Sequence, residues 1–160
     1  MQYTDKQKAI KNGFIKKDGR IYKQSLLEVW HSKGWLELEN SDYCADERLH
    51  YGMRLAFDYF IINRANLHSG LVQNTKVDSK QTPLSGAILT SLDNYQKAIR
   101  NVPSEFWPIV RQICIEEKNP IAPKKMSERQ RTYFHFLCRV DLCRGLDRVI
   151  SSYTQKLKKK

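Results

Sequence analysis

Apolar residues recur along most of this 160-residue chain at spacings of three and four, the pattern of helices that pack one face against a core. Glycine, proline and asparagine separate these stretches. No stretch alternates apolar and polar residues over the length that a convincing strand requires. The pattern therefore predicts an all-α fold, a single compact helical domain of about five to six helices.

The first half of the chain predicts two helices. A short helix within residues 21–38 is expected to end near Gly34, because glycine readily adopts the left-handed backbone that closes a helix. A longer helix is expected over about residues 41–65, with Asn40 or Ser41 as its N-cap. The second half of that helix, LAFDYFII, is apolar on nearly every side, which predicts burial against several neighbours.

The middle of the chain predicts a loop followed by two helices. Residues 67–83 lack helical spacing and indicate a long exposed loop. Thr82 and Pro83 have the pattern that opens a helix. Ser104 is expected to cap the helix after that, with Pro108 in its first turn, where a missing amide is tolerated. The expected buried stripe of this last helix is Phe106, Ile109, Val110, Ile113 and Cys114.

The final apolar segment changes face partway along. Measured around a helix axis at about 100° per residue from Val140, the apolar side chains between Tyr133 and Val140 cluster near about 0–60°. Those from Leu142 to Leu157 cluster near about 180–280°. One straight helix satisfies both faces only if it is sandwiched between two partners, whereas a turn at residues 139–141 lets both faces meet one core.

We favour the turn, and therefore predict that the domain ends in a helix-turn-helix-like pair over residues 127–157. Ser127 and Gln130 have the spacing of a capping box for the first helix of the pair, which is expected to reach about Cys138. Asp141 is then the expected N-cap of the second helix.

Charge is distributed unevenly. The chain has 28 Lys and Arg residues against 17 Asp and Glu, a formal net charge of +11. Residues 1–40 contribute +3, residues 41–117 contribute −1, and residues 118–160 contribute +9. A concentrated basic segment favours an acidic partner, nucleic acid first and an anionic membrane second.

The expected organisation is a basic arm over residues 1–20, a helical domain over residues 21–157 and a basic tail over residues 158–160. The four cysteines are too scattered for a disulfide framework and no leader segment precedes them, so we expect a cytoplasmic protein. The most apolar stretch, residues 55–62, is far shorter than the roughly 20 residues that span a bilayer, so no membrane partner is expected.

An outward polar stripe on the expected final helix is the candidate DNA-binding surface. Its four side chains fall between about 20° and 80°, opposite the apolar face of the same segment. Arginine offers a planar fork to guanine edges and phosphates, and a helix fits the major groove. A solvated helix face alone also explains such a stripe, but the charge beside it favours nucleic acid. With flanking phosphate contacts, the candidate residues are Lys124, Lys125, Arg129, Arg131, Arg139, Arg144, Arg148, Ser151, Gln155 and Lys158.

Catalytic and metal chemistry find little support in the sequence. A phosphate-binding glycine loop, a dinucleotide fingerprint and a paired-histidine zinc motif are all missing, so we predict no enzyme, no cofactor and no metal. His135, Cys138 and Cys143 have ligand chemistry, but their helical spacing places Cys143 on a different side.

Two sets of carboxylates have structural explanations. Asp42, Asp46 and Glu47 suit the positive end of the predicted long helix. Asp58 lies inside an apolar segment and is expected to form an ion pair with Arg54 or Arg64, because a carboxylate near a core requires a partner.

Four short segments carry a resemblance: SLLEVW (residues 25–30), ADERL (45–49), IVRQIC (109–114) and LCRGLDRVISSY (142–153), with Tyr95 and Ala98 between them. In this order they resemble an alphaproteobacterial domain family of unknown function. That family forms the C-terminal part of phage-like helix-turn-helix regulators, including the transcription activator of gene transfer agents. The resemblance implies an all-helical structure, promoter DNA binding by the last helix and contact with RNA polymerase.

We therefore expect a non-enzymatic transcriptional regulator that binds double-stranded DNA, an activator that also contacts RNA polymerase. Two alternatives stay open: an adaptor that binds an acidic protein partner, and a phage packaging subunit. Charge separates neither DNA from RNA nor one oligomeric state from another.

Overall fold

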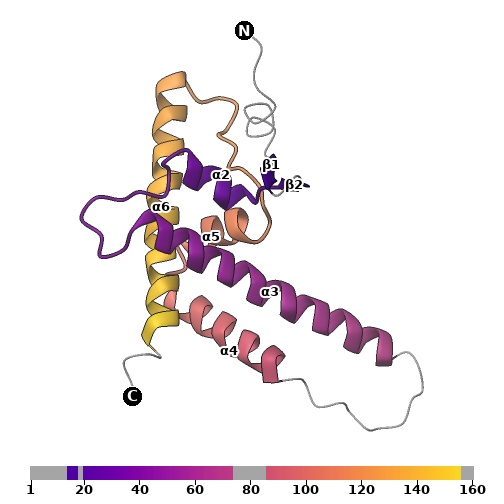
Figure 1. Cartoon of the computed structure of the whole chain (residues 1–160). Helices are drawn as coiled ribbons and strands as arrows, with labels where there is room; N and C mark the ends of the chain where they lie inside the picture. Colours follow the sequence, from indigo (N-terminus) through magenta and orange to yellow (C-terminus); the bar gives the residue numbers. More distant parts are fainter. Residues whose placement is uncertain (1–13, 18–19, 74–85, 156–160) are drawn as a thin grey trace.

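Helices dominate the computed structural model, which describes residues 14–17, 20–73 and 86–155 (Figure 1). The all-α prediction is confirmed. The helices are α2 (Leu26–Ser32), α3 (Ala45–Gln73), α4 (Gly86–Asn101), α5 (Trp107–Cys114) and α6 (Glu128–Thr154). α3 and α4 lie side by side and reach away from the rest of the molecule, while α6 crosses them near their other ends and also contacts α5 (Figure 1).

The core lies where α6 meets α3, α4 and α5, and α2 closes it from another side. Its apolar side chains come from all five helices and from the turn after α2. Each fully buried Leu, Ile or Val contributes about 1.5–3 kcal/mol relative to an exposed position. The most deeply buried apolar side chains include Leu27, Leu36, Leu55, Val110, Ile113, Leu142, Leu146 and Val149.

A glycine permits the close approach of α5 to α6. A Cβ at Gly145 would lie 2.4 Å from Cγ2 of Val110, closer than real Cβ atoms approach, and 3.3 Å from Cβ of Phe106, which is a tight contact. The glycine in LCRGLDRVISSY is therefore explained by helix packing.

A buried arginine ties three parts of the chain together. Arg48 of α3 is 0% exposed, and its Nε donates to Oδ1 of Asp147 on α6 at 2.7 Å. Its Nη1 donates to the carbonyl of Leu36 at 2.8 Å and its Nη2 donates to Oγ of Ser41 at 2.6 Å. Because a buried charge is stable only when it is paired and hydrogen-bonded, this network fixes the turn before α3 against α6.

Asp58 forms a second buried connection, between α3, α4 and α6. It accepts from Oγ of Ser91 at 2.9 Å and from the hydroxyl of Tyr153 at 2.6 Å, and Nε of Arg54 lies 3.9 Å away. Of the two predicted partners, Arg54 is therefore confirmed. Burial and the hydrogen bond to Asp58 raise the pKa of Tyr153, because both favour the neutral phenol.

Three helix ends agree with local signals in the sequence, and one does not. The capping box of Ser127 and Gln130 is confirmed, and Ser25 with Glu28 forms another at the start of α2. Gly34 follows α2 with φ of +73°, as expected of a helix stop. The prediction for Ser104 is wrong, because α5 begins at Trp107 and has no side-chain cap.

α3 differs from its prediction at both ends. It begins at Ala45, so neither Asn40 nor Ser41 is its N-cap; Ser41 instead donates to Oδ2 of Asp147 at 2.7 Å. It continues to Gln73, so the first residues of the predicted 67–83 loop are helical, and the start of the next helix predicted at Thr82 lies outside the described residues.

The expected burial of LAFDYFII on several sides is only partly correct. Leu55 and Asp58 are buried, and α3 does contact four other helices. Phe57 and Phe60, however, are 54% and 56% exposed, because they lie on the face of α3 that no described element covers.

The predicted helix-turn-helix is wrong. α6 is one helix of 27 residues that passes through residues 139–141 without interruption. These positions contain no glycine or proline to break the backbone hydrogen bonds, so Asp141 is a residue within the helix rather than its N-cap. The chain thus adopts one straight helix, whose two apolar faces point in different directions.

Two short strands precede the helices: β1 (Phe14–Lys17) and β2 (Arg20–Lys23), which pair antiparallel with Phe14 opposite Lys23. They lie where the sequence indicated an arm and the beginning of a helical domain. Asp18 and Gly19 join them, and Asp-Gly between two short apolar and basic runs is a recognised hairpin signal.

Candidate nucleic-acid interface

The C-terminal half of α6 presents the candidate stripe to solvent. Leu142, Leu146 and Val149 hold this half in the core, so the opposite side of the helix points outward. On that side Arg144 and Arg148, one helical turn apart, are exposed. The four predicted stripe residues, Arg144, Arg148, Ser151 and Gln155, therefore share one face, with Ser151 half-buried and the amide of Gln155 donating to its hydroxyl at 3.4 Å.

The two guanidinium groups of this stripe are not engaged by described carboxylates. Neither Arg144 nor Arg148 forms an ion pair with a carboxylate among the described residues. Asp147 is next to Arg148 in sequence and one turn from Arg144, but both of its oxygens bind Arg48 and Ser41. Arg48 therefore neutralises this carboxylate.

The predicted flanking cations lie at the other end of α6. Lys124, Lys125, Arg129 and Arg131 are all exposed. Arg129 falls on the same side of the helix as the stripe, whereas Arg131 lies about half a turn away. Nη2 of Arg131 donates to the carbonyl of Lys124 at 3.2 Å, which ties the start of α6 to the connection before it.

Arg139 does not belong to this surface. Its guanidinium carbon lies 3.9 Å above the ring of Trp35, and the side chain is half-buried against the turn after α2. We assign Arg139 to a structural cation–π contact instead. Lys158, the remaining candidate, lies outside the described residues.

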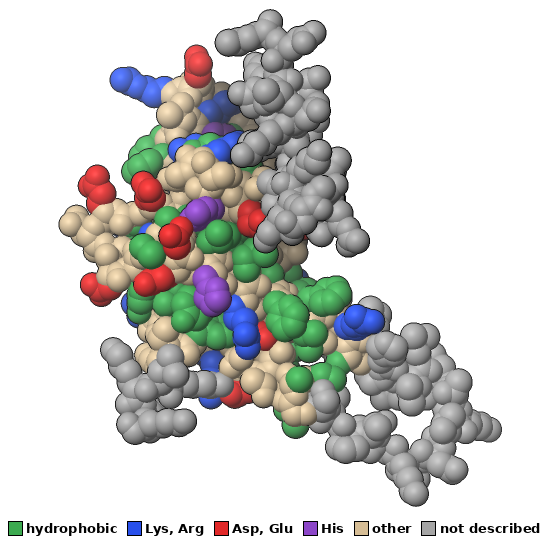
Figure 2. Space-filling model, viewed as in Figure 1, with side chains coloured by type: hydrophobic (Ala, Val, Ile, Leu, Met, Phe, Trp, Pro, Cys, Tyr) green, Lys and Arg blue, Asp and Glu red, His purple; other side chains and the backbone are tan. Residues whose placement is uncertain are grey.

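Charge is separated across the molecule. Described residues 118–155 contain eight basic residues and three acidic ones, whereas residues 36–47 contain five acidic residues and no basic one. All five of these carboxylates are exposed. Figure 2 shows acidic side chains gathered over the connection between α2 and α3, and basic ones where α6 begins. The two ends of this charge distribution therefore differ in sign, with the positive one on α6 and the connection before it.

The N-terminal half of α6 carries a surface that the sequence reasoning missed. Tyr133, Phe136 and Leu137 are 62%, 56% and 39% exposed, respectively. The signal for it in the sequence is the half-turn change of apolar face, which a straight helix places on two different sides. Because the helix is straight, these side chains point away from the core that holds the second half.

The described cysteines are free, and two are deeply buried. Burial raises the pKa of Cys114 to about 12 and that of Cys143 to about 11, so neither is a reactive thiolate near neutral pH. Among the described residues, no three histidine, cysteine or carboxylate side chains converge as metal ligands, and no described helix has the length and apolar character to cross a bilayer.

Two segments that carry the family resemblance meet in the core. Arg48 belongs to ADERL and Asp147 belongs to LCRGLDRVISSY, and their side chains form the buried ion pair. Tyr153, at the end of the same segment, binds Asp58. The segments therefore contribute mainly to packing between helices. No family model, no curated protein and no solved structure matches the chain.

Proposed function

We propose that this chain binds double-stranded DNA through the C-terminal half of α6 and acts as a non-enzymatic transcriptional regulator. The observation that carries the proposal is the exposed pair Arg144 and Arg148, one turn apart and without a carboxylate partner among the described residues. Two such guanidinium groups reach phosphates or guanine edges when the helix lies along a major groove.

A continuous helix suits this contact as well as a helix-turn-helix does. Basic regions of zipper proteins enter the major groove as uninterrupted helices, so the groove requires an outward basic face rather than a preceding turn. The stripe from Arg144 to Gln155 covers three helical turns. An activating role and contact with RNA polymerase rest on the family resemblance alone.

The test replaces both guanidinium groups. Arg144→Ala with Arg148→Ala should keep the helical circular dichroism spectrum, lower the affinity for a fluorescent DNA duplex and reduce the slope of log affinity against log salt by about 2, about one per lost phosphate contact. Fluorescence anisotropy at a series of salt concentrations measures both quantities.

A matched control removes the same charge elsewhere. Lys97→Ala with Arg111→Ala removes two half-exposed cations from α4 and α5, and should leave the salt slope close to that of the unmodified chain. An equal loss in both variants would show that only net charge matters. If the chain is instead an adaptor for an acidic protein, neither the unmodified chain nor the variants should bind the duplex at moderate salt.

A further inference from the structure

The outward face of the first half of α6 is apolar, and none of the described helices or strands covers it. Tyr133 is adjacent on the helix surface to Phe136 and Leu137, since residues three and four apart are neighbours there. All three are exposed, and Val140 continues the same face toward the arginine stripe. A surface helix normally turns such a face into a core, but here the core lies on the other side of the helix.

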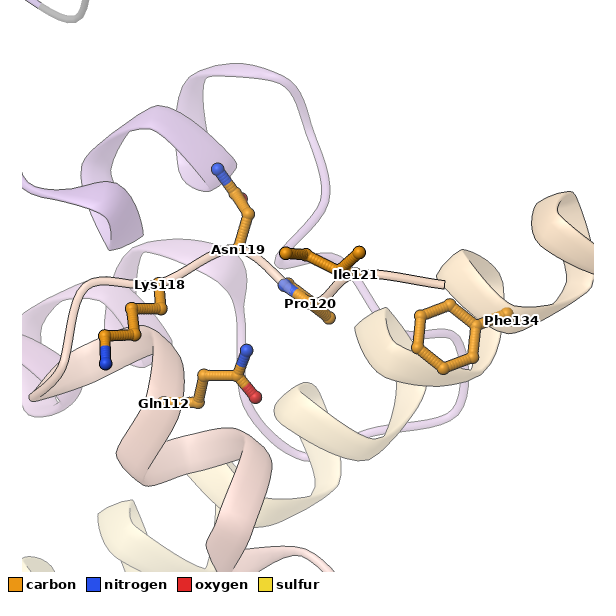
Figure 3. A pocket seen from close by; sticks show the side chains of 6 residues that line it. All are labelled: Gln112, Lys118, Asn119, Pro120, Ile121 and Phe134. Atoms are coloured by element: carbon orange, nitrogen blue, oxygen red, sulfur yellow. The ribbon is translucent and has the colours of Figure 1, made fainter. Parts of the chain in front are cut away.

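A hollow borders this face. Phe134, one turn before Leu137, lines it together with Ile121, Pro120 and Gln112, and its volume is about 610 Å³ (Figure 3). Ile121 is 86% exposed beside it. A concave site next to exposed aromatic side chains is the arrangement that receives large anchor side chains at protein interfaces.

The rim of the hollow is held in place by α2. Nε1 of Trp30 donates to Oδ1 of Asn119 at 3.1 Å, and the backbone amide of Leu26 donates to Oε1 of Glu117 at 3.2 Å. The hollow is therefore formed before a partner arrives, which lowers the entropy lost on binding.

The charge near this surface indicates which kind of partner it can bind. Residues 116–131 contain five basic side chains and three acidic ones. Of the acidic side chains, Glu116 pairs with Arg111 and Glu117 accepts from the amide of Leu26, whereas Lys118 lines the hollow. A second copy of this face would bring two basic rims together, which disfavours a symmetric dimer. A DNA duplex would meet the basic rim, but its phosphates and sugars would leave the aromatic rings uncovered.

We infer that this surface binds a segment of a partner protein that carries large apolar side chains flanked by Asp or Glu. The apolar side chains cover the outward face of α6 and enter the hollow, and the carboxylates meet the basic rim. This inference goes beyond the proposed function, because it uses the opposite half of α6 from Arg144 and Arg148. The surface consists of Ile121, Phe134, Tyr133, Phe136 and Leu137, with Lys118 lining the hollow. The exposed side chains of Lys124, Lys125 and Arg129 lie in the connection before α6 and in its first turn.

Three synthetic fluorescent peptides of equal length test the inference with the full chain. The first carries Phe and Leu at helical spacing between Asp and Glu residues, the second has Ser at the apolar positions, and the third has Asn and Gln at the acidic positions. The first should bind at least about tenfold more tightly than either of the others, since it alone satisfies both features. Equal affinities, or no binding of the first peptide, would overturn the inference.

A pair of matched variants locates the binding. Tyr133→Ser with Phe136→Ser should weaken binding of the first peptide at least about tenfold. Phe57→Ser with Phe60→Ser removes two rings of similar exposure from α3 and should leave that affinity unchanged. All four positions are exposed, so both variants should keep the helical spectrum. An equal loss of affinity in the α3 variant would contradict the assignment.

Two further measurements identify other occupants. Sedimentation of a dimer that Tyr133→Ser with Phe136→Ser dissociates would show that a second copy covers the face, and would overturn the inference. A weaker affinity of that variant for duplex DNA would show that nucleic acid covers the face, and would also overturn the inference. Arg144→Ala with Arg148→Ala should keep peptide binding within about twofold, which separates this inference from the proposed DNA contact.

Discussion

The two halves of α6 share one unbroken helix but have opposite relations to the core. In the second half Leu142 and Leu146 are fully buried and arginines face solvent; in the first half Tyr133 and Phe136 face solvent. Burying such rings would stabilise the fold by about 1.5–3 kcal/mol each. A break in the helix, however, would create two new ends with unpaired backbone groups, each costing about 1–3 kcal/mol if buried. Local backbone pairing therefore decides the continuity of α6, and the position of the core does not.

The largest difference in stability between the two halves is expected at the buried ion pair of the second half. Asp147→Ala leaves the guanidinium of Arg48 without its carboxylate at 0% exposure, and should lower the free energy of unfolding by about 3–5 kcal/mol. Urea denaturation followed by circular dichroism measures the change. Asp141→Ala removes the same charge two turns earlier and should change stability by less than about 0.5 kcal/mol. Similar effects at both positions would refute a special role for the pair.

High pH should lower the free energy of unfolding, because the thiol of Cys143 is buried in the second half of α6. Burial raises the pKa of Cys143 from 9.0 to about 11, so the folded state favours the neutral thiol. The resulting stability is fully present below pH 9 and is lost as pH rises through about 11. Cys143→Ala should therefore reduce the decrease in unfolding free energy between pH 9 and 11 by about 1–3 kcal/mol.

Cys138, in the first half of α6, provides the control for this pH effect. Its thiol is half-buried, and burial followed by the charge of Asp141 raises its pKa. Because this thiol is less buried than that of Cys143, Cys138→Ala should change the pH dependence less. Denaturation curves at matched pH values compare the two variants, and a larger effect of Cys138→Ala would contradict the difference between the halves.

The smallest effect on stability is expected in the first half. Tyr133→Ser with Phe136→Ser should change the unfolding free energy by less than about 0.5 kcal/mol, because both side chains are already in contact with water. Thermal and urea denaturation measure this directly. A loss of more than about 2 kcal/mol would mean that these rings support the fold of the chain itself, and the face would then not be free for a partner.

Two features set by neighbouring residues could be predicted from the sequence, whereas the pairing of residues far apart in the chain could not. The capping box of Ser127 and Gln130 depends on four consecutive positions, and the buried stripe of α5 on one helical period. The partner of Arg48 lies 99 positions away, so no local pattern indicates it. The stripe around Arg144 could be placed on one face from spacing alone. That Asp147 binds Arg48 and Ser41 instead of this stripe follows only from the folded structure.

The turn predicted within α6 and the missing prediction of the hairpin both concern local signals in the sequence. The change of apolar face along α6 was interpreted as a bend, although residues 139–141 contain no helix breaker. The strands of the hairpin have four residues each and were too short to stand out, although Asp18 and Gly19 between them favour a tight turn.

The pairing of Arg48 with Asp147 has a consequence for how homologous chains can diverge. A substitution that removes the guanidinium at position 48 would leave a carboxylate one turn from Arg144 and beside Arg148, where it could neutralise them without any change in the stripe itself. A change at position 48 or 147 alone would also break the buried ion pair, so homologous chains that keep a cationic outer surface on α6 are expected to exchange the two positions together.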